Sequence, residues 1–184
     1  FKQKTAYEIR LSLVGSEMCI RDRVEGRLFQ LTWQNGVAFV YDLLSFSKVE
    51  HFEYAGEGWG LCYDGRDLVM SDGSSSLAFR DPGTFAVRRK LEVRRQGKPV
   101  SRLNELECVG DRIYANIWMT DEIVVIDPNS GAVTAAIDAS GLLTPAERAA
   151  SDVLNGIAYD EDRGDFLITG KLWPKVFRVR FVPR

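Results

Sequence analysis

Short apolar runs recur along the chain. Each contains a polar or aromatic residue that is followed, two places later, by an apolar residue. The pattern occurs at Gly58-Trp59-Gly60-Leu61, Leu103-Asn104-Glu105-Leu106-Glu107 and Leu154-Asn155-Gly156-Ile157. Leu61 and Leu106 are 45 residues apart, and Leu106 and Ile157 are 51 residues apart. A repeat of roughly 40–50 residues built from short strands is typical of β-propeller blades. We therefore expect an all-β fold of the β-propeller class.

Turn motifs repeat with the same period. Asp81-Pro82-Gly83 and Asp127-Pro128-Asn129-Ser130-Gly131 start 46 residues apart, and these residue types favour tight turns. The repeat therefore spans whole blades. We expect residues 24–184 to form an incomplete propeller of about three and a half blades, in which the first blade lacks its innermost strand.

One segment breaks the strand pattern. Thr144-Pro145-Ala146-Glu147 has the sequence of a capping box with proline at the first helical position. We expect a short helix through Arg148-Ala149-Ala150, in a loop that could form the rim of a site.

Residues 1–23 fit neither strand alternation nor the layout of a signal peptide. They resemble a translated sequencing-adapter string that recurs at the ends of metagenomic gene predictions. We expect this segment to be non-native and to add no strand, with the native protein beginning upstream of residue 24. The alternative is a genuine N-terminal extension.

The composition excludes several classes of function. A net charge of −2 gives no electrostatic reason to bind nucleic acid or an anionic membrane. The 3 cysteines and 1 histidine include no C-x-x-C motif, which argues against a Cys/His zinc site. His51 lies in an alternating strand and is expected to face solvent. Cys62 and Cys108 are expected to be separate buried thiols, because inner strands of adjacent blades should hold their Cα atoms more than about 7 Å apart.

Candidate chemistry falls on the inner strands. The first strand of each blade lines the central channel of a propeller, so Trp59, Asn104 and Asn155 are candidates to converge there. Lys171 follows a glycine in another strand and is a candidate channel-lining cation. The alternative, an exposed strand lysine, stays open.

Several strings resemble those of the glutaminyl-peptide cyclotransferases of the bacterial and plant type, and together they cover the chain from residue 26 to the end. They are Gln30-Leu31-Thr32-Trp33, Gly36-Val37-Ala38-Phe39-Val40-Tyr41-Asp42, Gly56-Glu57-Gly58-Trp59-Gly60-Leu61, Leu103–Glu107, Tyr114-Ala115-Asn116-Ile117-Trp118, Leu154–Tyr159 and Gly170–Lys175.

The resemblance implies a five-bladed propeller that converts an N-terminal glutamine of a peptide or protein into pyroglutamate and releases ammonia. It implies no zinc and no other cofactor. The expected partners are peptides or proteins with an N-terminal glutamine, without nucleic acid or membrane. A monomer is expected when the protein is complete, and the expected location is periplasmic or secreted.

The resemblance also implies the site residues. Trp59, Asn104 and Asn155 match channel positions of the family, and Trp118 and Lys171 match site residues on second strands. The family's two preceding blades carry a glutamine and a glutamate in motifs that this chain lacks. That glutamate is the family's expected proton shuttle, and Glu105 cannot replace it, because its register matches Gly60 and Gly156. We therefore expect the chain alone to be inactive. The alternative function is a non-catalytic propeller that binds partners.

Overall fold

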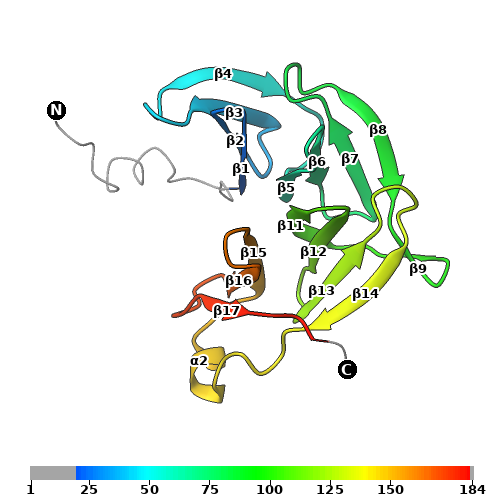
Figure 1. The fold of residues 1–184 in the computed structure, drawn as a ribbon, viewed down its shortest axis with the longest axis vertical. Helices are drawn as coiled ribbons and strands as arrows, with labels where there is room; N and C mark the ends of the chain where they lie inside the picture. Colours follow the sequence, from blue (N-terminus) through cyan, green and yellow to red (C-terminus); the bar gives the residue numbers. More distant parts are fainter. Residues whose placement is uncertain (1–19, 183–184) are drawn as a thin grey trace. The chain divides into compact units, whose positions relative to one another are not determined.

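The computed structural model describes residues 20–182. Within these residues, four antiparallel sheets of three or four strands follow one another along the chain, and in each the strands pair in sequence order (Figure 1). The chain divides into two compact units, one ending at Gly58 and the other beginning at Trp59. The prediction of an all-β fold is confirmed.

The first unit holds one four-stranded sheet. Its strands are β1 (Ile20–Val24), β2 (Arg27–Leu31), β3 (Val37–Asp42) and β4 (Lys48–Glu53). His51 is exposed on β4, as expected.

The second unit holds the other three sheets. The first of them contains β5 (Gly60–Tyr63), β6 (Leu68–Ser71), β7 (Ser76–Arg80) and β8 (Val87–Glu92). The next contains β11 (Leu103–Val109), β12 (Arg112–Ile117), β13 (Glu122–Ile126) and β14 (Val133–Asp138). The last contains β15 (Leu154–Asp160), β16 (Asp165–Gly170) and β17 (Phe177–Val179). The segment from Arg94 to Ser101 contains a small hairpin, β9 (Arg94–Arg95) with β10 (Lys98–Pro99).

Two predictions about the first sheet are wrong: that it lacks its innermost strand, and that residues 1–23 add no strand. Its inner strand is present as β1, so the expectation that residues 1–23 add no strand is wrong for residues 20–23. The physical reason is the turn between β1 and β2, where Glu25 and Gly26 adopt φ angles of 50° and 77°. Two successive positive φ values are characteristic of the tight turn that closes a two-residue hairpin. The expectation for residues 1–19 falls outside the described residues.

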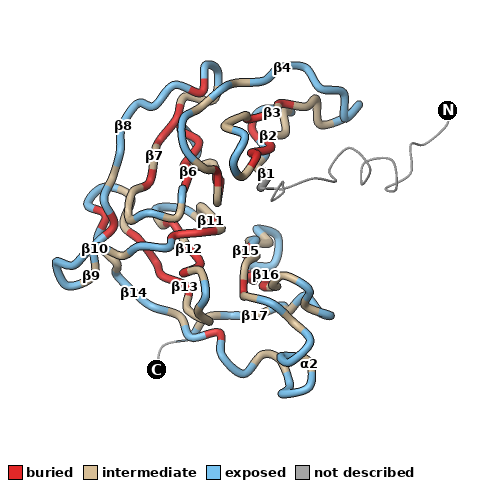
Figure 2. Tube along the Cα trace, turned by 180° about the vertical axis from the view of Figure 1, so that it is seen from behind, coloured by how far each residue is buried: buried red, intermediate tan, exposed pale blue. Residues whose placement is uncertain are grey.

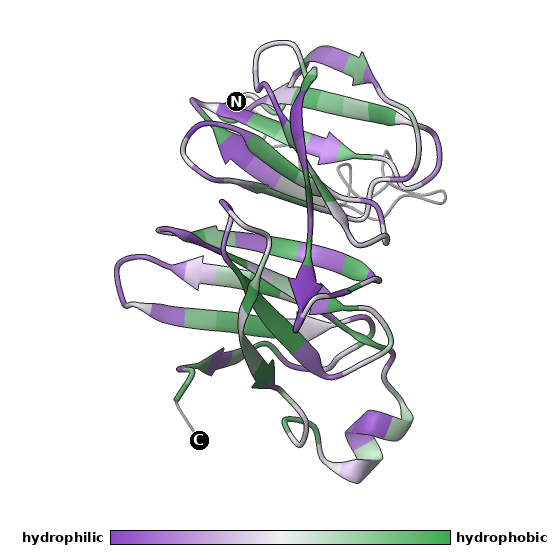
Figure 3. Ribbon diagram, turned by 90° about the vertical axis from the view of Figure 1, so that its right-hand side faces the viewer, coloured by the Kyte–Doolittle hydropathy of each residue, from purple (hydrophilic) through white to green (hydrophobic). Residues whose placement is uncertain are grey.

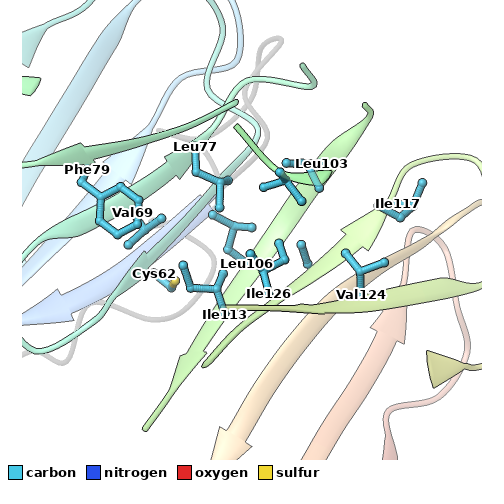
Figure 4. Close-up of a cluster of buried hydrophobic side chains, with 12 residues drawn as sticks. Cys62, Val69, Leu77, Phe79, Leu103, Leu106, Ile113, Ile117, Val124 and Ile126 are labelled. Carbon is cyan, nitrogen blue, oxygen red and sulfur yellow. The ribbon is translucent and has the colours of Figure 1, made fainter. Parts of the chain in front are cut away.

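Two apolar clusters form the core of the second unit. One joins the β5–β8 sheet to the β11–β14 sheet through side chains that include Leu77, Phe79, Leu106 and Ile113 (Figure 4). The other joins the β11–β14 sheet to the last sheet and includes Ile123, Leu154 and Phe166. The outer strands β4, β8 and β14 are mostly exposed, whereas the strands inside each sheet are largely buried, and β6 is buried at every position (Figure 2). The alternation of hydrophobic and hydrophilic residues can be followed along the strands in Figure 3. None of the helices within residues 20–182 is long and apolar enough to cross a membrane.

The repeat predicted from the turns is present in the structure. Asp42, Asp81 and Asp127 each end or follow a third strand and accept backbone N–H groups of the next turn. In all three the pKa of the carboxyl is lowered, first of all by these backbone hydrogen bonds. Leu61, Leu106 and Ile157 are buried at the same place of their inner strands, as expected.

The prediction for the cysteines is wrong. Cys62 of β5 and Cys108 of β11 form a disulfide, with their Cα atoms 5.5 Å apart. The inner strands β5 and β11 pack directly against each other, so these residues lie closer than the expected separation of more than about 7 Å. The disulfide therefore joins two neighbouring inner strands.

The inserted loop contains the expected helix, α2 (Pro145–Ala149). The Thr144 hydroxyl accepts from the Glu147 N–H at 3.3 Å, and the Glu147 carboxylate accepts from the Thr144 N–H at 2.9 Å. The predicted capping box is confirmed.

Candidate functional site

Asn104 and Asn155 occupy the same structural position in two neighbouring inner strands. The pairing register shifts between Leu103 and Leu106 in β11 and between Leu154 and Ile157 in β15. These shifts are β-bulges, which re-aim side chains and are common beside active sites. β11 also packs against β15, so the two bulged strands are neighbours. The fold therefore places the two asparagines as the sequence predicts, on adjacent inner strands.

Trp59 lies one residue before β5, and its ring contacts that of Trp118 from the next sheet. Its N–H donates to the Ser71 carbonyl at 3.0 Å, which holds the backbone of Trp59 against β6. The two indole rings lie edge to face, with centroids 5.4 Å apart and an interplanar angle of 82°. Gly73 has a φ of 81°, and a Cβ there would lie 2.8 Å from the Trp59 ring. The structure thus joins two tryptophans that are 59 residues apart in the sequence.

Trp118 and Lys171 lie one residue beyond the second strands of their sheets, in two loops of the same design. The Trp118 N–H donates to the Arg102 carbonyl at 2.8 Å, and the Lys171 N–H donates to the Val153 carbonyl at 2.9 Å. The residues that follow, Met119 and Leu172, are exposed and have φ angles of 67° and 59°.

A left-handed conformation costs a residue other than glycine about 1–3 kcal/mol. Because Met119 and Leu172 are exposed, burial of their own side chains does not explain this cost. Both residues occupy the third position of a tight turn closed by a backbone hydrogen bond, and the turns directly follow the second strands of their sheets.

Buried amides are the most distinctive polar feature of the site. Asn104 is 1% exposed, and within residues 20–182 neither its side-chain oxygen nor its nitrogen has a hydrogen-bond partner. The side-chain oxygen of the half-buried Asn155 is also buried without a partner in that range. An unpaired buried polar group costs about 1–3 kcal/mol. These amides therefore have hydrogen-bonding capacity for a polar ligand.

Asn116 is a residue of the same kind that the sequence reasoning did not select. It is 0% exposed, and both polar atoms of its side chain lack a partner among the described residues. Its place in β12 is opposite the bulge that contains Asn104 and Glu105. The available signal was an asparagine inside an apolar strand, between Ala115 and Ile117.

The backbone of Asn104 is fixed by its neighbours on the adjacent sheet. The Ser71 hydroxyl donates to the Asn104 carbonyl at 2.6 Å. A Cβ at Gly60 would lie 2.0 Å from the same oxygen, so the approach of β5 to β11 requires glycine. The Asn104 side chain is therefore held on a rigid strand.

The helix-bearing loop is attached to the loop that follows Lys171. The Lys175 ammonium contacts the Glu147 carboxylate at 2.5 Å. This contact, together with the hydrogen bonds from Thr144, lowers the pKa of Glu147 to about 2. A hollow of about 130 Å³ lies between this loop and Trp173. That the loop forms the rim of the site stays a prediction.

The donor set determines which chemistry is available. Indole rings, carboxamides and one ammonium can enclose, hydrogen-bond and polarise a neutral polar substrate. Within the described part of the chain, no group of three or more His, Cys, Asp or Glu side chains is arranged to hold a metal ion.

Comparison with known proteins identifies relatives over nearly the whole described chain. A family model described as glutamine cyclotransferase matches residues 21–181. A glutaminyl-peptide cyclotransferase of Arabidopsis thaliana is 43% identical over 159 residues, which cover 84% of this chain and 49% of the relative. The chain thus spans about half the length of that relative.

Solved structures support the fold. The crystal structure of Myxococcus xanthus glutaminyl cyclase matches with a TM-score of 0.78 and 42% identity, over 88% of this chain and 71% of that one. BamB from Moraxella catarrhalis matches with a TM-score of 0.51 and 19% identity, over 82% of this chain and 42% of that one, which is a likeness of fold alone. The β-propeller class predicted from the repeat is confirmed. The family match and the identity to the Arabidopsis protein together establish that the chain belongs to the glutamine cyclotransferase family.

Proposed function

We propose that this chain carries part of the active site of a metal-independent glutaminyl-peptide cyclotransferase, which converts the N-terminal glutamine of peptides or proteins into pyroglutamate. The observation that carries the proposal is the buried amide of Asn104 together with the buried side-chain oxygen of Asn155. Among the described residues these atoms have no hydrogen-bond partner, and they belong to adjacent bulged strands. Trp59 and Trp118 of the same unit lie edge to face. Indoles, carboxamides and an ammonium are not the ligands that zinc prefers, which supports the metal-independent form of the reaction.

The reaction closes a ring within a single residue. The α-amine of the substrate glutamine attacks the side-chain amide carbon, a C–N bond forms, and the bond to the amide nitrogen breaks to release ammonia. Because both reacting groups belong to one residue, much of the rate enhancement comes from holding a folded conformer. Trp59 and Trp118 enclose the glutamine side chain and exclude water, and Asn104 and Asn155 hydrogen-bond its amide or main chain.

Charge develops on the amide oxygen as the ring closes. We assign Lys171 to stabilise this oxyanion, a role in which one preorganised group commonly contributes about 10²–10³ in rate. The proton released by the amine must reach the departing ammonia, and a carboxylate is suited to transfer it. None of the five proposed site residues is a carboxylate, so the expectation that the chain alone is inactive remains part of the proposal.

A hybrid enzyme tests the proposal in a full-length setting. Residues 21–181 would replace the matched segment of the Myxococcus enzyme, and turnover of a glutamine-initiated peptide would be measured. Trp59→Ala, Asn155→Ala and Lys171→Ala should each lower turnover by about 10²–10³. Lys90→Ala, on the exposed strand β8, is the matched control and should change turnover little. Equal turnover by all of these variants would refute the assignment.

A further inference from the structure

A hollow beside the proposed site has two contrasting sides. It has a volume of about 130 Å³, and Leu142, Leu143 and Trp173 line it together with Asp121 and Arg148. This volume is well above the roughly 10–15 Å³ that one water molecule requires. The hollow therefore has room for part of a ligand, with an apolar side and a charged side.

The hollow adjoins both loops of the proposed site. Trp173 follows Lys171 by two residues, so their Cα atoms are at most about 7 Å apart, and Asp121 follows Trp118 by three residues, at most about 11 Å away. Asp152 connects Lys171 and Trp173 through hydrogen bonds of its backbone. Its N–H donates to the Lys171 carbonyl at 2.9 Å, and its carbonyl accepts from the Trp173 indole N–H at 3.0 Å.

Trp173 and Leu142, on the apolar side, pack closely against neighbouring residues. A Cβ at Gly170 would lie 2.3 Å from the Trp173 indole nitrogen, so that ring packs closely on the strand end. Phe177 meets the Trp173 ring edge to face, with centroids 5.9 Å apart. Leu142 packs against the apolar cluster of the last two sheets. A wall that is already ordered loses little entropy when an apolar side chain binds to it.

The charged side is built by an ion pair. The Arg148 guanidinium contacts the Asp121 carboxylate at 2.9 Å and is held at the end of α2. A guanidinium has five N–H donors, more than one carboxylate uses. Arg148 can therefore also donate a hydrogen bond to a backbone carbonyl of a peptide that binds at the edge of the hollow.

We propose that the hollow binds the residue that follows the N-terminal glutamine of the substrate, and that it favours a large apolar side chain there. An extended peptide advances about 3.3–3.6 Å per residue, so the second residue of a peptide whose glutamine lies at Lys171 covers about half of the upper limit of about 7 Å to Trp173. A large side chain on that second residue spans the rest. The inference rests on the proposed function, because it takes the glutamine site as the starting point. It assigns Trp173 and Leu143 as specificity-determining residues.

Peptide binding to the full 184-residue chain tests this inference without requiring turnover. The probes are Gln-Leu-Ala, Gln-Gly-Ala and Asn-Leu-Ala, and the dissociation constants are measured by calorimetry. We expect Gln-Leu-Ala to bind at least about tenfold more tightly than Gln-Gly-Ala, the factor that burial of a leucine side chain provides. Leu143→Ala and Trp173→Ala should reduce this ratio to near one, whereas Val87→Ala on β8 should leave it unchanged.

The outcomes separate the two proposals. If glutamine is preferred to asparagine but leucine is not preferred to glycine, the hollow is not the second subsite and the proposed function stands. If leucine is preferred through Trp173 and Leu143 but asparagine binds as well as glutamine, the hollow is a subsite and the proposed function is wrong. Failure of the folded chain to bind Gln-Leu-Ala would overturn the inference.

Discussion

At the scale of the residue, the buried amide of Asn116 carries a cost in stability. Both polar atoms of its buried amide are unpartnered among the described residues, and such a group costs about 1–3 kcal/mol. A purely structural strand would carry an apolar residue at this position. Asn116 lies opposite the bulge that contains Asn104, and we infer that its amide is present for the same site as that of Asn104.

The first prediction follows from this cost. Asn116→Leu should leave the thermal midpoint unchanged or raise it, because the unpaired amide is removed, while turnover of a glutamine-initiated peptide by the hybrid falls by about 10²-fold or more. Asn129→Leu, in an exposed turn, is the control for the added apolar side chain. A variant that is both less stable and fully active would show that Asn116 serves packing alone.

A second prediction concerns the close approach of β5 to β11. Gly60→Ala would place a Cβ 2.0 Å from the Asn104 carbonyl, which belongs to the backbone and cannot swing away. We expect the free energy of unfolding, measured by urea denaturation, to fall by about 1–3 kcal/mol. At Gly83 the nearest atom is a side-chain oxygen 3.2 Å away rather than a backbone atom 2.0 Å away, so Gly83→Ala should cost much less. Equal stability of the two variants would contradict the close approach.

At the scale of the element, α2 depends on the charge of Glu147. The pKa of this carboxyl is lowered from 4.5 to about 2, first by its contact with Lys175 and then by Thr144. A lowered folded-state pKa stabilises the loop at pH values above the unfolded value, and that contribution is lost as the pH falls through about 2.

A carboxyl titration followed by NMR tests this third prediction. In Lys175→Met the pKa of Glu147 should rise toward 4.5, since its largest source of stabilisation is gone. In the control Lys90→Met it should stay near 2. An unchanged pKa in Lys175→Met would mean that the capping box alone holds the carboxylate ionised.

The sequence predicted elements where local chemistry determines them. The capping box at Thr144 and the turns at Asp81 and Asp127 are set by side chains that hydrogen-bond neighbouring backbone groups, and such signals can be read directly. Strand β1 was missed because its residues, Ile20–Val24, lack the alternation of a half-buried strand and depend on pairing with β2. Such pairing depends on the partner strand, so the sequence of one strand alone gives little indication of it.

The candidate site could be predicted only in part, for the same reason. Trp59, Asn104 and Asn155 stand out because they occur at one position of a repeat. The approach of Trp59 to Trp118 depends on how the sheets pack, so no local pattern reveals it. For Asn116 the local signal is only that an asparagine interrupts an apolar strand, and its burial also depends on packing. The Cys62–Cys108 disulfide is not predicted either, because the distance between neighbouring inner strands depends on tertiary packing and not on the local sequence.

At the scale of the whole molecule, this disulfide links two sheets through a loop of 46 residues. Closing a loop of that length stabilises the folded state by about 4 kcal/mol in the chain-entropy description. The fourth prediction is that reduction of the chain lowers its free energy of unfolding by about this amount, measured by urea denaturation with and without a reductant. The variant Cys62→Ala/Cys108→Ala should be insensitive to the reductant. Identical curves for the reduced and oxidised native chain would contradict the link.

Ammonia release is the most direct measure of the central claim, that this chain supplies the glutamine-binding part of a cyclotransferase site. The hybrid bearing residues 21–181 would be incubated with Gln-Leu-Ala and with Asn-Leu-Ala, and both ammonia and peptide mass would be followed. We expect Gln-Leu-Ala to lose the mass of one ammonia molecule and Asn-Leu-Ala to keep its mass, and we expect Lys171→Ala to suppress the conversion. A folded hybrid that releases ammonia from Gln-Leu-Ala no faster than buffer does would contradict the account.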